Sequence, residues 1–217
     1  RDGLQARAWE FYQYFEERRK REAFAGRPVG KAQLCAVGTD GPFTVACNLR
    51  GASELCLDLY EDPQFAGELL EFVTEAIIVR VKKVMEINGT GYPLPGWCFA
   101  DDCIQLLSER TYREFVLPCH RRLLEVFSTG RPNAIHICGK VGHLLAVLQA
   151  ELNMQDFELG FPVDLGEARR IVGPGALLKG NLHPQILHDG PVSLIESETE
   201  NIMGSGVFLV LIALAGR

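Results

Sequence analysis

Apolar residues at three- and four-residue intervals predict helices in several parts of the chain. The longest pattern runs over residues 62–87 and stops at Asn88 and Gly89. A shorter pattern covers residues 2–24. Ser108 can cap a further helix, which Pro118 interrupts before the apolar pattern continues. These stretches predict a protein in which amphipathic helices cover a core.

Short apolar runs bounded by turn residues predict six strands. They lie near Leu34, Phe99, Ile135, Phe157, Leu178 and Leu209. In the second half of the chain strands alternate with helices, and the predicted strands include residues 156–161 and 207–212. One predicted helix covers residues 164–172, where Asp164 and Glu167 form a capping box, and another runs from Leu182 to about Glu200. Alternating strands and helices imply an α/β fold with a parallel sheet.

The number of strands bears on the architecture. A closed barrel of parallel strands and helices needs eight strands and usually ~250 residues, and an arc of six strands leaves an unpaired edge. No low-complexity linker divides the 217 residues, so we expect one domain over residues 1–217. Either the sheet is open, or part of a (β/α)8 barrel is absent.

Composition narrows the function classes. With a net charge of −6, the chain lacks the basic surface that binding to nucleic acid requires, and the basic run at residues 18–21 has acidic neighbours. Seven cysteines without a disulfide framework, and no secretion signal at the start, predict a cytoplasmic location. The apolar run at 207–215 is about half of the ~20 residues that a membrane helix needs, so we expect no membrane contact.

The first candidate for chemistry is His136-Ile137-Cys138-Gly139, at the end of a predicted strand. Because side chains alternate along a strand, His136 and Cys138 are predicted to share a face, at the end where parallel sheets bind ligands. An imidazole and a thiolate suit zinc, which takes three protein ligands in catalytic sites. The alternative is a buried histidine and cysteine that bind no metal.

A third metal ligand is not identified by spacing. The candidates are Cys98, Cys103, Asp101, Asp102 and His183, all predicted near strand ends on the same side. Asp101 and Asp102 could instead be catalytic, transferring protons or binding substrate. Since adjacent residues of a strand face opposite ways, one of the two is expected to have a structural role, such as capping a helix or loop.

The segment Gly180-Asn181-Leu182-His183-Pro184 follows another predicted strand. Asn181 and His183 are candidates for binding a substrate, because a glycine after a strand lets the backbone approach a ligand. The alternative is that these residues only shape the loop. The glycine-rich fingerprints of phosphate-binding loops are absent from the sequence, so we expect no nucleotide site of that kind.

Several segments together carry a family resemblance. They are Gly41-Pro42-Phe43-Thr44, Asp101-Asp102, Tyr112-Arg113-Glu114-Phe115, Leu117-Pro118, His136-x-Cys138-Gly139, Pro162-Val163-Asp164 and Gly180-Asn181-Leu182-x-Pro184. The series, from about Gly38 to Gly206, resembles the uroporphyrinogen decarboxylase superfamily. The resemblance implies a (β/α)8 barrel of which this chain is the later part, without the first two strand-helix units. That expectation agrees with the count of six strands.

The resemblance also implies two kinds of activity. Porphyrinogen decarboxylases of this family have a tyrosine near the position of Asn48 and a late histidine, whereas no histidine follows His188 here. His136 and Cys138 match the start of the H-x-C…C zinc motif of the methyltransferase branch, in which zinc lowers the pKa of a thiol. The distal cysteine of that motif has no counterpart in residues 207–217.

Three functions are therefore considered. The first is zinc-assisted methyl transfer between a corrinoid, carried by a partner protein, and a thiol or related acceptor. The second is decarboxylation of a tetrapyrrole in porphyrin biosynthesis, with Asp101, Asp102 and Asn181 facing the substrate. The third is a non-catalytic barrel fragment that associates with itself through its open sheet edge.

Overall fold

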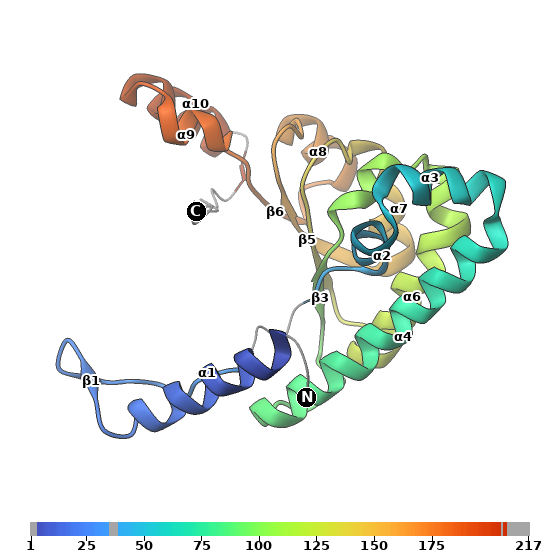
Figure 1. Cartoon of the computed structure of the whole chain (residues 1–217). Helices are drawn as coiled ribbons and strands as arrows, with labels where there is room; N and C mark the ends of the chain where they lie inside the picture. Colours follow the sequence, from blue (N-terminus) through green and yellow to red (C-terminus); the bar gives the residue numbers. More distant parts are fainter. Residues whose placement is uncertain (1–3, 35–38, 205, 208–217) are drawn as a thin grey trace.

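The computed structural model describes residues 4–34, 39–204 and 206–207, and a parallel sheet lies at its centre (Figure 1). The sheet consists of β3 (Cys98–Ala100), β4 (Asn133–Ile137), β5 (Met154–Leu159) and β6 (Leu177–Lys179), in the order β3-β4-β5-β6. Every neighbouring pair is parallel. This arrangement confirms the predicted α/β class with a parallel sheet. A separate antiparallel pair is formed by β1 (Ala23–Phe24) and β2 (Arg27–Pro28).

Helices make up most of the remaining structure. They are α1 (Leu4–Arg18), α2 (Pro42–Arg50), α3 (Ala52–Glu61), α4 (Pro63–Asn88), η1 (Asp102–Leu106), α5 (Glu109–Thr111), the π-helical turn η2 (Tyr112–Val116), α6 (Leu117–Phe127), η3 (Gly142–Leu144), α7 (Leu145–Leu152), α8 (Leu165–Val172), α9 (Pro184–Asp189) and α10 (Val192–Gly204). No helix in the described part of the chain is both long enough and apolar enough to cross a membrane.

The long helix α4 confirms the strongest sequence pattern. The Asp62 side chain accepts a hydrogen bond from the Phe65 backbone N–H and caps the first turn. Gly89 ends the helix in the left-handed conformation, at φ 70°. Of the apolar residues at three- and four-residue spacing, Val73, Ile77 and Val81 are buried in the core, as predicted. Phe65 and Phe72, which belong to the same pattern, are exposed.

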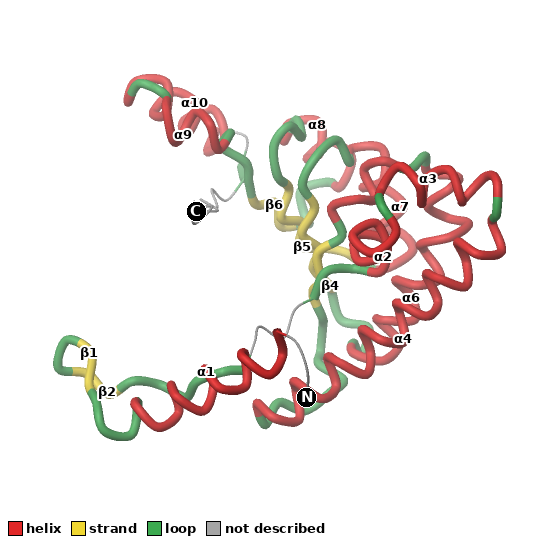
Figure 2. Tube along the Cα trace, viewed as in Figure 1, coloured by secondary structure: helices red, strands yellow, loops and turns green. Residues whose placement is uncertain are grey.

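The two faces of the sheet differ in character. Phe99, Ile135, Phe157 and Leu178 lie side by side in register, and all four are buried. Helices α2, α4, α6 and α7 lie on one side of the sheet, whereas α1 and α10 extend away on the other side (Figure 2). The next row, Ala100-His136-Glu158-Lys179, is only partly buried and points to the opposite face, because side chains alternate along each strand. The partly buried polar row of the sheet therefore lies on the face without the helical layer.

The amino-terminal segment differs from its prediction. The helix expected over residues 2–24 ends at Arg18, and a hairpin follows. Ala25 and Gly26 form its turn with φ values of 48° and 74°, the two positive φ angles of a tight hairpin turn. Residues 31–34 are not a strand, and residues 35–38 lie outside the described part. Asp40 makes a single parallel bridge with Ala100.

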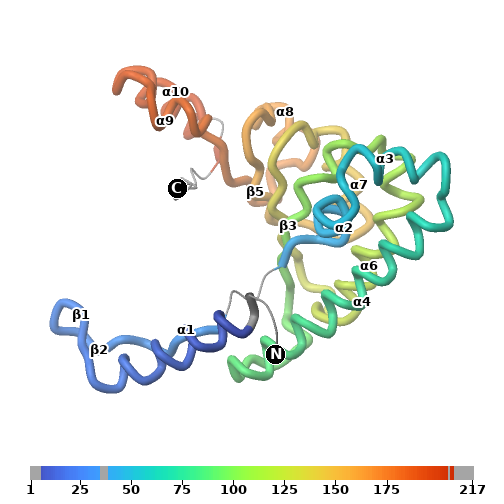
Figure 3. Tube along the Cα trace, viewed as in Figure 1, coloured from blue at the N-terminus to red at the C-terminus, as the bar shows by residue number. Residues whose placement is uncertain are grey.

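Two further differences from the predicted elements concern the carboxyl-terminal part of the chain. The helix expected between Leu182 and Glu200 is divided into α9 and α10 at Gly190-Pro191, because the residue before a proline disfavours helical geometry. Both helices lie at the red end of the chain, apart from the main helical layer (Figure 3). The strand expected over residues 207–212 falls almost wholly outside the described residues.

Candidate metal centre

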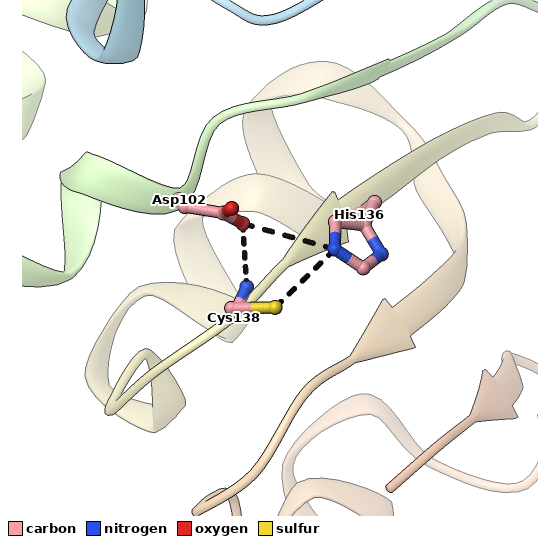
Figure 4. Close-up of side chains that lie close together, drawn as sticks. All are labelled: Asp102, His136 and Cys138. Carbon is pink, nitrogen blue, oxygen red and sulfur yellow. Dashed lines mark hydrogen bonds and ion pairs between the residues drawn. The ribbon is translucent and has the colours of Figure 1, made fainter. Parts of the chain in front are cut away.

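Three potential metal ligands meet at the carboxyl ends of β3 and β4 (Figure 4). His136 lies on β4, Cys138 directly follows it, and Asp102 begins η1 after β3. The Cys138 Sγ lies 3.4 Å from His136 Nε2, and Asp102 Oδ1 lies 3.8 Å from the same nitrogen. All three side chains are partly buried, and their ligand atoms lie within 4.8 Å of one another. The predicted pairing of His136 and Cys138 on one face agrees with this geometry.

Backbone contacts hold the loop after β4 in place. The Cys138 backbone N–H donates to Asp102 Oδ1 at 2.7 Å, and the Lys140 N–H donates to Gln105 Oε1 at 3.1 Å. Between them, Gly139 has φ 88°, and a Cβ at this position would lie 1.8 Å from Gln105 Oε1. The positive φ favours glycine at this position, and a larger residue would also have to displace the Gln105 side chain.

The surroundings of Cys138 disfavour a free thiolate. Burial raises the pKa of the Cys138 thiol above its ordinary value, and the nearby charges of Asp102 and Glu158 raise that pKa further. Reactive cysteines need a cation or a helix N-terminus to lower their pKa, whereas the charges that act on Cys138, those of Asp102 and Glu158, are negative. The site is thus suited to binding a cation, which would supply the missing positive charge, rather than to nucleophilic attack by Cys138 alone.

Of the two adjacent aspartates, Asp101 has the interior position. Its side chain is fully buried and accepts hydrogen bonds from the Phe43 N–H, from the Thr44 N–H and hydroxyl, and from His120 Nε2. These bonds join the first turn of α2 to the end of β3 and to α6. Asp102, with 42% of its side chain exposed, is the carboxylate that faces His136 and Cys138.

The other sequence candidates lie outside this cluster. The Asn181 amide donates to the carbonyls of Gly160 and Val163, and so connects the loops after β5 and β6. His183 Nδ1 accepts from the Gln185 N–H at the start of α9, and its ring packs 4.1 Å from that of Phe161. Cys98 is exposed on β3, and the Cys103 N–H donates to the Thr44 hydroxyl.

Two residues near these groups were not singled out by sequence reasoning. Glu158 Oε1 lies 3.4 Å from His136 Nδ1, on the side of the ring away from Cys138. His120 bridges Asp101 and the Tyr112 hydroxyl, which lies 3.0 Å from His120 Nδ1. The sequence does show that Glu158 is an acidic residue in a predicted strand. Its pairing with His136, however, follows only from the register of β4 and β5.

A hollow of about 540 Å³ opens beside the cluster on the uncovered face of the sheet. His136, Glu158 and Lys179 line it, together with Asp40, Cys98 and Asp156. Its volume lies in the range of small-molecule sites. Lys179 is already paired with Asp156, their Nζ and Oδ2 atoms being 2.6 Å apart.

The donor set fits zinc. Imidazole nitrogen, thiolate sulfur and carboxylate oxygen are all zinc ligands, and three protein ligands leave one position open for water or substrate. Donor atoms at tetrahedral angles around zinc lie about 3.3–3.6 Å apart, given metal-ligand distances of about 2.0–2.3 Å. The separation of 3.4 Å between His136 Nε2 and Cys138 Sγ lies in this range, and the 3.8 Å between His136 Nε2 and Asp102 Oδ1 is slightly longer.

Comparison with known proteins gives two kinds of relative. The chain is 30% identical over 190 residues to the uroporphyrinogen decarboxylase of Streptomyces coelicolor, covering 84% of this chain and 51% of that protein. It is 28% identical over 173 residues to the methylated-thiol–coenzyme M methyltransferase of Methanosarcina mazei, covering 78% and 44%. The chain thus spans about half the length of the curated relatives it matches.

A solved structure and a family model complete the comparison. A methyltransferase from Methanosarcina mazei superposes with a TM-score of 0.63 at 22% identity, covering 79% of this chain and 50% of the other. This likeness shows that the chain shares part of the barrel-like fold. The family model described as uroporphyrinogen decarboxylase (URO-D) matches residues 27–209. The matched range includes the sheet, the helical layer and the His136–Cys138 cluster, and the chain therefore belongs to the URO-D family.

Proposed function

We propose that this chain forms part of a zinc-dependent methyltransferase that moves a methyl group between a corrinoid and a thiol or related acceptor. One observation carries the proposal: a nitrogen of His136, the sulfur of Cys138 and a carboxylate oxygen of Asp102 converge at one end of the sheet. The relative that acts on a methylated thiol adds support from within the same family. The corrinoid would be held by a partner protein.

Each residue of the cluster would have a distinct part. His136 Nε2 and Cys138 Sγ would bind the metal, and Asp102 is the third candidate ligand because its Oδ1 lies 3.8 Å from His136 Nε2. Zinc bound here would lower the pKa of an acceptor thiol, so that the sulfur is presented as a thiolate. The hollow beside His136 would hold the acceptor next to the open coordination position.

Metal analysis tests the first step of this proposal. We expect about one zinc ion per chain in the protein purified from zinc-supplemented cells, and at least a tenfold loss in His136→Ala and in Cys138→Ala. His188→Ala and Cys98→Ala are matched controls, because both side chains are exposed and neither belongs to the cluster. Equal zinc contents near zero in all five proteins would contradict the proposal.

The reaction itself is tested separately. The chain is incubated with methylcobalamin and a small thiol, and the thioether product is quantified by mass spectrometry. We expect product with the native chain and with His188→Ala, whose side chain does not line the hollow, and background levels with His136→Ala. If the chain binds zinc but forms no thioether, the metal site is supported and the proposed methyl transfer to a thiol is wrong.

A second candidate function is decarboxylation of a porphyrinogen. It is favoured by the 30% identity to the uroporphyrinogen decarboxylase of Streptomyces coelicolor. With Asp101 enclosed by four hydrogen bonds, Asp102 is the carboxylate left to meet a pyrrole N–H group. Incubation with uroporphyrinogen should then give stepwise loss of carboxylates, without need for zinc. Unchanged substrate would count against this function.

A further inference from the structure

The two ring nitrogens of His136 face different groups. Nε2 points toward the cluster, 3.4 Å from Cys138 Sγ and 3.8 Å from Asp102 Oδ1 (Figure 4). Nδ1, on the other side of the ring, lies 3.4 Å from Glu158 Oε1. The ring therefore lies between the candidate ligands and a carboxylate that is not one of them.

The sheet itself brings Glu158 to this place. His136 and Glu158 are register partners on the neighbouring parallel strands β4 and β5, so their side chains point to the same face. Both are partly buried, with 25% and 33% of their side chains exposed. The register is maintained by the apolar neighbours Phe157 and Leu159, which are buried on the opposite face of β5.

Competing partners for Glu158 are already engaged. Lys179 follows Glu158 in the same row across the sheet, but its ammonium group pairs with Asp156 at 2.6 Å. Among the described residues, His136 is the basic side chain that pairs with Glu158. The carboxylate is thus directed to the imidazole rather than to a lysine or an arginine.

We propose that Glu158 is a positioning residue that accepts a hydrogen bond from Nδ1–H of His136. A neutral imidazole carries its hydrogen on one nitrogen, and a carboxylate beside Nδ1 stabilises the form with the hydrogen there. That tautomer leaves the Nε2 lone pair free and aimed at the cluster. Carboxylates in this position orient a metal-binding histidine and increase its basicity. The inference rests on the proposed role of His136 as a metal ligand.

Metal affinity gives the first test. Cobalt(II) is titrated into metal-free protein and followed by its visible absorption, which depends on coordination geometry. We expect Glu158→Ala to weaken binding by about 10- to 100-fold. Glu158→Gln should weaken it less, because the amide oxygen can still accept from Nδ1–H. The control is Asp40→Asn, which removes a carboxylate from the same hollow without touching His136.

The control also separates position from charge. Asp40→Asn could weaken cobalt binding as much as Glu158→Ala does. In that case the loss of affinity comes from removing any negative charge near the site, and the positioning role of Glu158 is wrong. Circular dichroism and thermal unfolding of each variant establish that the fold is intact. Should Glu158→Ala fail to fold, Glu158→Gln carries the comparison with Asp40→Asn.

The tautomer gives a second test that needs no metal. In nitrogen-15 NMR of the metal-free chain, at a pH where the imidazole is uncharged, we expect the His136 signals of the Nδ1–H form, assigned by their loss in His136→Ala. Glu158→Ala should shift them to the Nε2–H form. An Nε2–H form in the native chain would overturn the inference. If the native chain binds no metal at all, the proposed function fails, but the NMR result still decides the role of Glu158.

Discussion

Asp101 and Asp102 are neighbours in the sequence with different surroundings. Asp101 uses both carboxylate oxygens inside the core: Oδ1 accepts from the Thr44 N–H and hydroxyl, and Oδ2 accepts from Phe43 N–H and His120 Nε2. Asp102 accepts from the Cys138 N–H and is partly exposed. Strand alternation predicts that the two side chains diverge, but the sequence does not say which one is buried, because that depends on where α2 packs.

This difference predicts opposite effects of two equivalent substitutions. Asp101→Asn would place an amide NH₂ against hydrogen-bond donors, so we expect a loss of about 3 kcal/mol in the free energy of unfolding. Asp102→Asn should cost less than about 1 kcal/mol, since its side chain is partly exposed, but should weaken zinc binding. Urea unfolding followed by circular dichroism measures the first quantity, and metal titration the second. Equal destabilisation by both substitutions would contradict the assignment.

The candidate site was partly predictable from single residues. The H-x-C pattern at a strand end predicts that His136 and Cys138 share a face, and the 3.4 Å distance between Nε2 and Sγ agrees with it. Their role as metal ligands stays a prediction. Glu158 and His120 could not be assigned partners, because the contacts depend on strand register and on helix packing, which single-residue patterns do not encode.

At the scale of elements, the helix around Pro118 explains how the buried network is completed. Proline lacks an N–H and its ring clashes with the carbonyl four residues earlier, here that of Glu114. The chain accommodates this with the π-helical turn η2 (Tyr112–Val116) directly before α6. Tyr112 then lies within hydrogen-bond distance of His120, one on each side of the break.

Tyr112 should make stability depend on pH in the alkaline range. Burial raises the pKa of the Tyr112 hydroxyl well above its usual value, and the negative charge of Asp101 raises it further. In the unfolded chain this tyrosine ionises near pH ~10, whereas the folded chain keeps its proton. Its contribution to the free energy of unfolding is therefore fully present below pH ~10 and falls by up to about 1.4 kcal/mol per pH unit above it.

The Tyr112→Phe variant tests this dependence. Near pH 8 we expect the variant to be less stable by about 1 kcal/mol, because His120 loses its hydroxyl partner. Above pH ~10 the native chain loses stability that the variant keeps, so the difference should shrink with rising pH. Urea unfolding of both proteins at pH 8 and at about pH 10.5 measures the change. A difference that is constant with pH would contradict the role assigned to Tyr112.

The loop after β5 approaches the candidate site closely. A Cβ at Gly160 would lie 2.7 Å from Cys138 Sγ, closer than real Cβ atoms approach, and 3.0 Å from Cys138 Cα, which is a tight contact. We expect Gly160→Ala to displace the Cys138 thiol and to weaken cobalt binding by about tenfold. Changes to residues that support a metal ligand typically weaken metal binding by about 10- to 100-fold, and this is the lower end of that range. Gly175→Ala, where a Cβ would meet nothing within 4 Å, is the control. Unchanged affinity in Gly160→Ala would place the metal elsewhere.

Elements with strong local signals were predicted well. Helix α4 (Pro63–Asn88) matches the prediction of 62–87, and α8 (Leu165–Val172) begins after the capping box at Asp164. Strand β5 lies two residues earlier than expected, at Met154–Leu159. Helix α3 (Ala52–Glu61), which buries Leu55 and Leu59, was not predicted.

At the scale of the whole molecule, the sheet has one layer of helices. Parallel sheets normally have both faces covered, and the polar row Ala100-His136-Glu158-Lys179 lies on the face without that layer. In a closed (β/α)8 barrel the helices lie outside and the other face of the sheet points inward, so this polar row corresponds to the inner face. The chain covers about half of its curated relatives' length, and its described residues contain four of the six parallel strands that the sequence predicts.

An open sheet of this kind leads us to expect self-association. In the described sheet β6 has a neighbour on one side only, β5, so one edge of its backbone is available for pairing. Helix α1 adds exposed aromatic side chains, with Phe11 and Phe15 each 55% exposed. Light scattering after size exclusion should therefore give a mass above the 24.1 kDa of one chain, rising with concentration.

A substitution in α1 separates the two surfaces. If the edge of β6 drives association, a Phe11→Glu, Phe15→Glu double variant should keep the higher mass, because these side chains lie outside the sheet. A monomeric double variant would instead assign the association to α1 and contradict pairing through the edge. A native chain that runs as a compact monomer at every concentration would contradict both, since it would mean that unpaired strand edges and exposed aromatic rings are tolerated in water at no measurable cost.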